Sequence, residues 1–231
     1  MPRRPATSAR KTATQDRSKA TVDALLAATA RVLVKEGYDR ASTNKIAEAA
    51  GVSIGSLYQY VPSKEALVAA VISRHTGEMM EVVRTSMVRV AGLPIPEASR
   101  ELVKVMIDAH RIEPKLHRVL VEQIPRVGNM EDIEKLDEEA TTLVRAYLEG
   151  HRDEIAIDDL EIASFICVAS VEALTHAAVL RRPALLDNPR FVEEVAAMIT
   201  RYLTTGVTTG LVTPVTPVAD GKRPAASRSI S

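Results

Sequence analysis

The sequence predicts an all-α protein, and both its composition and its apolar spacing support this prediction. Among the 231 residues, 46% are hydrophobic but only 3% are aromatic, and Trp is absent. The apolar residues are mostly Ala, Val, Leu and Ile in long runs without glycine, which favours helices that pack on helices. We find no strand pattern, internal repeat or glycine-rich phosphate loop. A chain of this length buries one large core or two smaller ones without disulfides.

The two ends of the chain differ from the rest and are expected to be disordered. Residues 1–17 and 213–231 consist largely of Pro, Ser, Thr, Ala and basic residues. Segments of this composition do not bury enough apolar surface to offset their conformational entropy. The folded part is therefore expected between residues 18 and 212, and the first tail is basic.

The first predicted helix is amphipathic and ends near Gly37. Its apolar face consists of Val22, Leu25, Leu26, Thr29 and Leu33. Spacings of three and four residues place these side chains on one side of a helix. Glycine commonly follows the last helical turn because it adopts the left-handed conformation freely.

Two short helices are expected next, separated by a turn at Gly51. The first runs from about Thr43 to Ala50 and the second from about Ser53 to Tyr60, with Ser53 as a suitable N-cap. Val52 and Leu57 can pack inward against the first short helix and fix the angle between the two. The exposed side of the second is small and polar. This layout is that of a helix-turn-helix.

Six longer helices complete the predicted fold and bring the total to about nine. Pro62 ends the third helix, and Ser63 is a good N-cap for a long fourth helix with an apolar stripe at Leu67, Val68, Val71 and Ile72. The others are expected at Glu97–Ile112, Lys115–Ile124, Met130–His151, Leu160–Leu180 and Pro189–Thr205. The segment Leu160–Leu180 is apolar around most of its circumference, so it must be covered by the core or by a second subunit.

Charge is divided unevenly along a chain whose formal net charge is zero. Residues 1–75 contain 12 Lys and Arg against 6 Asp and Glu, and the remainder contains 18 against 24. A basic module joined to an acidic one suits a protein that binds nucleic acid through one part only. Uneven scatter by chance is the alternative interpretation.

Other function classes find less support in the sequence. No GxSxG, HExxH, paired-cysteine or phosphate-loop pattern is present, so we expect no enzyme. Cys167 is the single cysteine, which excludes an internal disulfide and suits a reducing cytoplasm. We find no signal peptide and no run of about 18 uncharged apolar residues, and we therefore expect a cytoplasmic protein.

The segment from Val22 to Leu67 resembles a known family. The features that carry the resemblance are Gly37-Tyr38, Thr43, Ile46-Ala47, Ala50-Gly51-Val52-Ser53, Gly55-Ser56-Leu57-Tyr58, Lys64 and Leu67. Together these positions are similar to the DNA-binding domain of the TetR-type transcriptional repressor family. The resemblance covers about residues 18 to 70 and is more specific than a generic helix-turn-helix.

The resemblance implies which residues contact DNA. They are Thr43, Asn44, Ser53, Ile54, Gly55, Ser56, Tyr58, Gln59, Tyr60 and Lys64. Tyr58, Tyr60 and Lys64 would bind phosphates, whereas Gln59 could bond an adenine edge and Ile54 could touch a thymine methyl. The alternatives are half-buried structural tyrosines and a solvated lysine.

The resemblance also implies a division of labour. Residues 18–66 would form the DNA-binding domain, and residues 67–212 a helical domain for ligand binding and dimerisation. The expected function is a homodimeric repressor that leaves a palindromic operator when a small-molecule effector binds. The dimer would form through the last two helices, with an apolar stripe at Ile162, Phe165, Ile166, Ala169 and Ala173. The alternatives are an activator, a regulator controlled by a protein partner, and a helical binding module that does not use DNA.

Residues of a ligand pocket are chosen for large or polar side chains on apolar helical faces. They are Met79, Met80, Met87, Met106, His110, Phe165, Cys167, Glu172 and His176. Glu172 and His176 are i, i+4 neighbours that can simply pair with each other. No cofactor or metal is expected, because Pro114 interrupts the helix between His110 and His117 and the sequence reveals no second ligand cluster. The effector and the operator sequence do not follow from the sequence.

Overall fold

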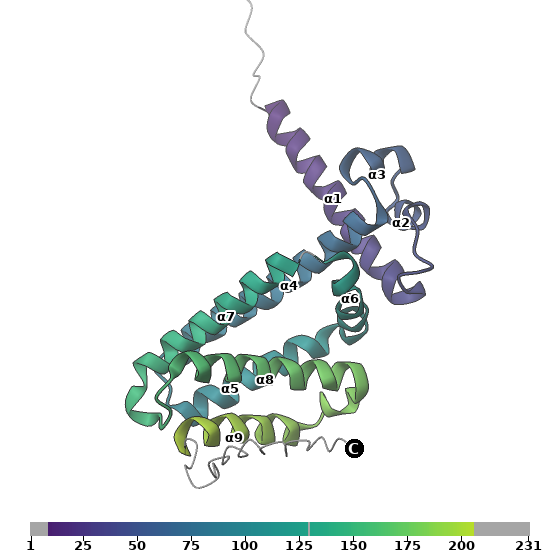
Figure 1. Ribbon diagram of the computed structural model, residues 1–231. Helices are drawn as coiled ribbons and strands as arrows, with labels where there is room; N and C mark the ends of the chain where they lie inside the picture. Colours follow the sequence, from purple (N-terminus) through teal and green to yellow (C-terminus); the bar gives the residue numbers. More distant parts are fainter. Residues whose placement is uncertain (1–8, 129, 206–231) are drawn as a thin grey trace, which may run out of the picture.

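The computed structural model describes residues 9–128 and 130–205, and this part of the chain is helical without strands (Figure 1). Its α-helices are α1 (Ala9–Glu36), α2 (Thr43–Ala50), α3 (Ile54–Tyr60), α4 (Lys64–Val90), α5 (Ile95–Ile112), α6 (Pro114–Val127), α7 (Met130–Gly150), α8 (Leu160–Arg181) and α9 (Pro189–Thr205). Two short 3-10 helices, Arg152–Glu154 and Pro183–Leu185, flank α8. The all-α prediction, including about nine helices, is confirmed.

Local cap chemistry explains where the first helices begin and end. Ser53 accepts a hydrogen bond from the backbone N–H of Ser56, and Ser63 accepts one from that of Ala66, as expected for N-caps. Gly51 ends α2 with a φ of 70°, a left-handed conformation that costs glycine little. The predicted N-caps of α3 and α4 and the turn between α2 and α3 are thus confirmed.

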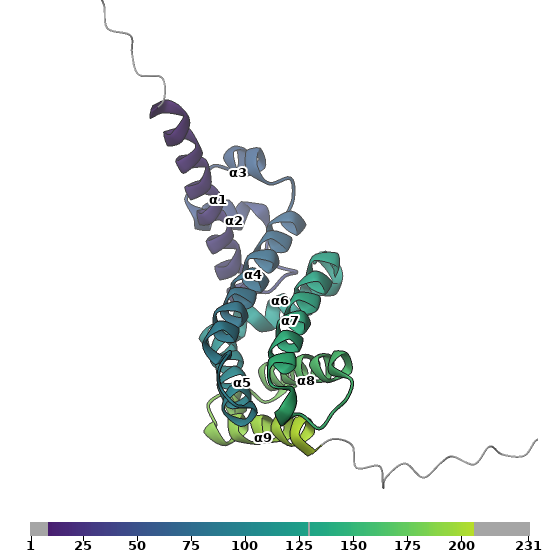
Figure 2. The same cartoon turned by 90° about the vertical axis from the view of Figure 1, so that its left-hand side faces the viewer.

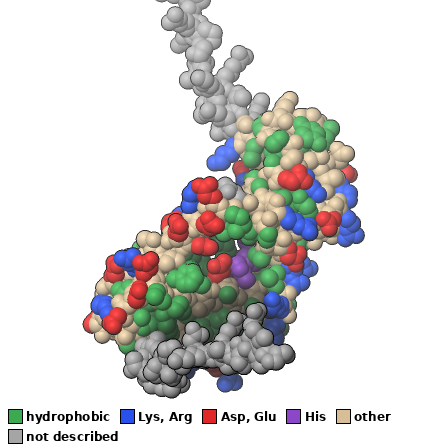
Figure 3. Space-filling view, viewed as in Figure 1, with side chains coloured by type: hydrophobic (Ala, Val, Ile, Leu, Met, Phe, Trp, Pro, Cys, Tyr) green, Lys and Arg blue, Asp and Glu red, His purple; other side chains and the backbone are tan. Residues whose placement is uncertain are grey.

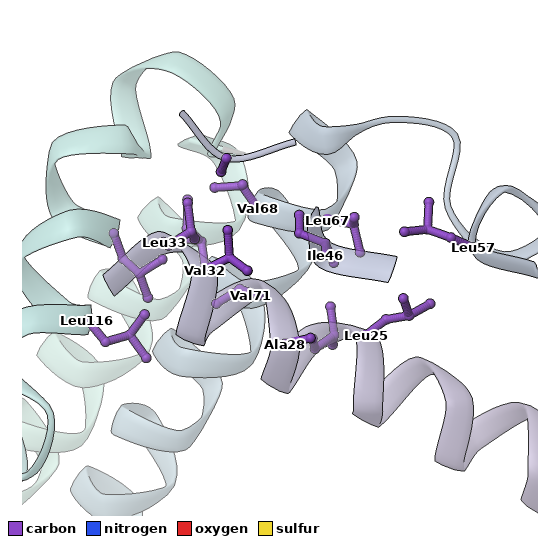
Figure 4. Packing of buried hydrophobic residues seen from close by; sticks show 14 of the residues in the cluster. Leu25, Ala28, Val32, Leu33, Ile46, Leu57, Leu67, Val68, Val71 and Leu116 are labelled. Carbon is purple, nitrogen blue, oxygen red and sulfur yellow. The ribbon is translucent and has the colours of Figure 1, made fainter. Parts of the chain in front are cut away.

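Helices α1 to α3 form an upper lobe that packs on the start of α4 (Figures 1 and 2). The core of this lobe contains Leu25, Leu33, Ile46, Leu57 and Leu67, each fully buried. Figure 4 shows these side chains converging from α1, α2, α3 and α4. The predicted inward positions of the helix-turn-helix are therefore the ones that fold its core.

The remaining helices form a lower body around the far part of α4. There α5 packs on α9, α7 packs on α8, and α4 packs on both α5 and α7. A bidentate pair joins α4 to α7, since Arg84 donates from Nε and an Nη atom to the two carboxylate oxygens of Glu139 at 2.7 and 2.8 Å. Long helix α4 thus belongs to both the lobe and the body.

Helix α6 connects the core of the lobe to that of the body. It contacts α1 and α4 on one side and α5 and α8 on the other. Leu116 and Leu120 of α6 belong to the same apolar cluster as Leu25 and Leu57 of the lobe. A displacement of α6 relative to the body would therefore also displace side chains in the core of the lobe.

Some expected boundaries differ from those in the structure. Helix α1 begins at Ala9, inside the segment expected as a basic tail, and Leu67 beyond the expected boundary at 66 belongs to the core of the lobe. Helix α6 continues past Ile124 to Val127. Pro125 lacks a backbone N–H donor, but it lies so close to the end of the helix that the last turn is kept. Residues 1–8 and 206–231, which include most of the expected tails, lie outside the described residues.

Candidate nucleic-acid interface and ligand cavity

Helix α3 presents an uncharged and exposed surface on the upper lobe. Ile54, Tyr58 and Tyr60 are 39%, 53% and 39% exposed, and Gly55 and Gln59 are exposed as well. Leu57 alone on this helix is fully buried, so it anchors α3 to the lobe. No acidic side chain of α3 faces outward to repel a polyanion. The surface suits contact with the floor of a DNA groove.

The predicted contact residues gather at the exposed ends of α2 and α3 and the start of α4. Asn44 and Ser53 are exposed, and Thr43, Ser56 and Lys64 are half-buried. The hydroxyls of Thr43 and Tyr58 are hydrogen-bonded at 3.1 Å, which joins the start of α2 to the middle of α3. Ser53 caps α3 and also hydrogen-bonds the hydroxyl of Ser56 at 2.9 Å. The fold therefore brings Thr43 and Tyr58 of the predicted set into contact, although they lie on different helices.

Lys64 has a role that sequence spacing did not reveal. Its Nζ donates to the backbone oxygen of Tyr38 at 3.1 Å and lies 4.1 Å from the centroid of the Tyr38 ring. An ammonium has three donors, so these contacts leave donors for a phosphate. Lys64 thus connects the start of α4 to the loop after α1, and these contacts restrict the conformation of its side chain.

An apolar cavity of about 230 Å³ lies inside the lower body. Its walls come from α4, α5, α6, α7, α8 and α9, with side chains such as Ile72, Met79, Leu120, Val144 and Val171. Shape and lining of this kind are typical of a small-molecule site with a few polar groups that orient the ligand. A wider open groove of about 1010 Å³ runs along α5 and the start of α9, where charged side chains such as Arg100 and Glu193 pair with each other.

Most of the residues selected from sequence for a pocket line this cavity. They are Met79, Met80, Met87, Met106, His110, Cys167, Glu172 and His176. Phe165 is not among the lining residues and is 63% exposed, because it projects from the opposite side of α8 to Cys167. Sequence reasoning missed His75, His117, Asp137 and Tyr147, which line the cavity from α4, α6 and α7.

Four of the five histidines meet at one end of the cavity. His75, His110, His117 and His176 come from α4, α5, α6 and α8. The Nε2 of His75 is 2.8 Å from the Nδ1 of His117, and the ring centroids of His110 and His117 are 4.2 Å apart. Figure 3 shows histidine side chains at the centre of one face, beside hydrophobic and acidic groups. The sequence revealed no second group of metal ligands beside His110 and His117, so this convergence of four histidines was not predicted.

Burial favours the neutral forms of these imidazoles. It lowers the pKa of His110 to about 4 and that of His117 to about 2, and the neighbouring imidazoles contribute to both shifts. Burial also lowers the pKa of His75 and of His176. The Nδ1 of His176 lies 3.8 Å from a carboxylate oxygen of Glu172, so the predicted pair is present as a long contact. Neutral imidazoles each offer one nitrogen lone pair to a ligand.

Two carboxyls and a thiol complete the polar groups of the cavity. Burial raises the pKa of Asp137 and that of Glu172, which favours their protonated forms relative to carboxyls in water. Burial also raises the pKa of the Cys167 thiol to about 12. Cys167 therefore stays a thiol at neutral pH and fills space rather than acting as a nucleophile.

Helix α8 exposes large apolar side chains, and Met198 of α9 is exposed as well. Ile162 is 54% exposed, Phe165 is 63% exposed, and Met198 on α9 is 38% exposed. By length and composition alone, α8 is also the one helix among the described residues that could cross a membrane, and only 33% of its apolar window is buried. A helix shared between two subunits has the same composition.

Family models match both parts of the chain. Residues 25–71 match the model of bacterial regulatory proteins of the tetR family, and residues 94–203 match that of the tetracyclin repressor-like C-terminal domain. The two matches together span about two thirds of the chain. No protein with a curated description matches the sequence.

Solved structures of TetR-type regulators have a similar fold. A TetR family transcription regulator from Marinobacter aquaeolei VT8 shares 20% identity over 82% of this chain and 98% of that chain, with a TM-score of 0.62. A bacterial regulatory protein of the tetR family from Rhodococcus RHA1 shares 17% identity over 78% and 96%, with a TM-score of 0.62. The fatty acid degradation regulator FadR from Bacillus halodurans shares 20% identity over 81% and 96%, with a TM-score of 0.59.

Proposed function

The chain belongs to the TetR family of bacterial regulatory proteins, and from this membership we propose that it is a homodimeric repressor released from a palindromic operator by a small molecule. The observation that carries the proposal is the helix-turn-helix, whose α3 is exposed, uncharged and anchored by buried Leu57. A recognition helix of this kind enters the major groove while neighbouring groups bind phosphates. Tyr58, Tyr60 and Lys64 are assigned to the phosphates, and Ile54 and Gln59 to the bases.

The exposed apolar side chains of α8, with Met198 of α9, support the dimer. Burial of a large apolar side chain is worth about 1.5–3 kcal/mol, and two-fold symmetry uses each of the exposed residues Ile162, Phe165 and Met198 twice. A second copy of this chain would also cover α8, which the single chain leaves mostly unburied. The upper lobes of the two linked subunits, which we call the reading heads, then bind two half-sites about one helical turn of DNA apart.

Helix α6 offers a physical route from ligand to DNA. Its Leu116 and Leu120 belong to the core of the upper lobe, while its His117, Val121 and Ile124 line the cavity of the lower body. A small molecule that fits the cavity better with α6 displaced would favour a different position of the reading head. Operator affinity then falls by the ratio of the ligand's affinities for the two arrangements.

The chemistry of the cavity indicates the class of effector better than the fold does. Proteins of similar fold include a fatty acid degradation regulator and a protein described in terms of control of antibiotic production by bacterial hormones, so one architecture occurs in proteins with different described roles. The cavity here is apolar over most of its lining and polar at the histidine end. We expect a mainly apolar molecule with one hydrogen-bonding group.

Selection of bound sequences from a random DNA pool by the purified full chain is the experiment that tests the proposal. We expect enrichment of a palindrome, and binding that weakens steeply with salt because Lys and Arg contacts release counterions from the phosphates. Enrichment of a single half-site would contradict the dimer. No enrichment at low salt would contradict operator binding altogether.

Base contacts and phosphate contacts are expected to respond differently to substitution. Gln59→Ala should remove about 1–3 kcal/mol of discrimination at particular base pairs, whereas Tyr58→Phe should weaken binding to all sequences alike. Affinity measured against the selected operator and its single-base variants checks this division. Uniform loss with Gln59→Ala, or selective loss with Tyr58→Phe, would contradict it.

The assignment of Lys64 is tested through the salt dependence of binding. Lys64→Ala should weaken binding to every sequence and reduce the slope of log affinity against log salt by about 1. The melting temperature is measured in parallel, because the substitution also removes the contacts with Tyr38. A lower melting temperature with an unchanged salt slope would make Lys64 a structural residue only.

A further inference from the structure

We propose that His110, His117 and His176 form a binding site for a divalent transition metal ion of the zinc type at the polar end of the cavity. The candidate ligand nitrogens of these three residues all lie within 4.8 Å of one another. In a tetrahedral zinc site with bonds of about 2.0–2.1 Å, neighbouring nitrogens are about 3.4 Å apart. Side-chain rotations that move each ring by about an ångström would therefore close the site around an ion.

The hydrogen bonds of His110 engage one of its two ring nitrogens and leave the other free. The Nδ1 of His110 lies 2.7 Å from the backbone oxygen of Met106, so this nitrogen carries the proton and Nε2 keeps the lone pair. Metal-binding histidines commonly donate their second N–H to a carbonyl in this way, which fixes ring orientation. His110 is 3% exposed and has little freedom to turn elsewhere.

His117 provides the second, independent observation. Its Nδ1 is engaged with His75, but its Nε2 is buried and has no hydrogen-bond partner among the described residues. Leaving a buried polar atom without a partner costs about 1–3 kcal/mol, so such atoms commonly indicate an ion or ligand. In the tautomer whose Nδ1–H donates to the Nε2 of His75, the Nε2 of His117 carries a lone pair that a metal ion beside His110 would accept.

His176 completes the set from α8 and gives the ion a way in. Its side chain is 27% exposed, whereas His110 and His117 are almost fully buried. Three imidazoles suit zinc, copper or nickel better than the hard cations magnesium and calcium, which prefer oxygen ligands. The fourth position would be taken by water or by a donor atom of a molecule in the cavity, as in zinc sites that keep one position open.

Occupation of this site would tie three helices together. His110, His117 and His176 belong to α5, α6 and α8, and α6 also carries Leu116 in the core of the reading head. The metal site uses the cavity of the proposed repressor, but its existence does not depend on operator binding. The two proposals can therefore be tested separately on the same protein.

Metal binding is measured directly on the full chain after treatment with a chelator. We expect one Zn²⁺ per chain by equilibrium dialysis, a melting temperature that rises with zinc concentration, and the intense visible absorption of tetrahedral Co²⁺ when cobalt is used. His117→Leu and His176→Gln should each weaken Zn²⁺ binding by more than about 100-fold, since even residues that only orient a metal ligand contribute 10–100-fold. His75→Gln should fall within that smaller range.

Matched variants make the result decisive. His151→Gln removes the one histidine outside the cluster, and Cys167→Ser removes the nearby thiol, so both should bind zinc like the original protein. His117→Leu removes a buried nitrogen without a partner but also the hydrogen bond to His75, so its melting temperature without zinc is compared with that of His75→Gln, which loses the same hydrogen bond. Absence of zinc uptake, uptake unchanged by His117→Leu and His176→Gln, or uptake lost only with Cys167→Ser would overturn the site. Selection of a palindrome by a protein that binds no zinc would leave the proposed function intact.

Discussion

A protein in which Ile162 and Phe165 are both replaced by Glu is expected to be monomeric and to bind its operator at least about 100-fold more weakly. Both side chains are more than half exposed on the outer side of α8. In the proposed dimer they would be buried twice by symmetry, so the double substitution places four carboxylates in an apolar contact. Each reading head would then bind its half-site alone and lose the avidity of two linked sites, about 10²–10⁴-fold.

The monomer prediction is checked by sedimentation velocity and by operator titration of the same preparations. Val88→Glu is the matched control, because Val88 is 78% exposed on α4 and α4 does not belong to the proposed interface. The control should keep both the dimer and the affinity. An Ile162→Glu, Phe165→Glu protein that still sediments as a dimer would place the interface on another surface.

Helix positions were predictable because a helix is built from local interactions. The spacing of apolar residues and the placement of Ser and Pro gave Thr43–Ala50 and Pro189–Thr205 with the bounds found for α2 and α9. Inward positions in short amphipathic helices followed in the same way, as for Leu57 and Ile46. Once Leu57 is identified as the buried residue of α3, the other side chains of this helix must lie at its exposed surface, so they could be selected from the sequence.

Which side of α8 lines the cavity could not be predicted by the same argument. Apolar residues surround most of this helix, so periodicity does not indicate which side meets the cavity. Cys167, Glu172 and His176 turned out to line the cavity, whereas Phe165 lies outside it. The packing of α5, α6, α7 and α9 against α8 determines which side faces the cavity.

The histidine cluster depends entirely on tertiary structure. His75 and His176 are about one hundred residues apart, and Pro114 places His110 and His117 on two different helices. No local rule relates residues on four helices, which is why metal-ligand spacing in the sequence was uninformative. The contact of Lys64 with Tyr38 was missed for the same reason, since it joins α4 to the loop that follows α1.

Leu57→Ala is expected to abolish operator binding by loosening the reading head. Leu57 is fully buried and is the only fully buried residue of α3, so its truncation leaves a cavity beneath the recognition helix. Leu→Ala substitutions in cores cost about 2–5 kcal/mol of unfolding free energy. A small lobe in which two of the three helices are short has little stability to spare, and we expect a loss of operator affinity greater than about 100-fold for every sequence.

The matched control for this prediction is Ile54→Ala on the same helix. Ile54 is 39% exposed, so its truncation should change the unfolding free energy by no more than about 0.5 kcal/mol and affect only discrimination at a thymine. Hydrogen exchange should show faster opening of residues 18–66 in Leu57→Ala, with the helices of the lower body still protected. Because Leu57 shares a cluster with Leu116 and Leu120 of α6, exchange should also increase along α6. If α6 stayed fully protected while the head opened, the two would not be mechanically linked, and release of the operator through α6 would be contradicted.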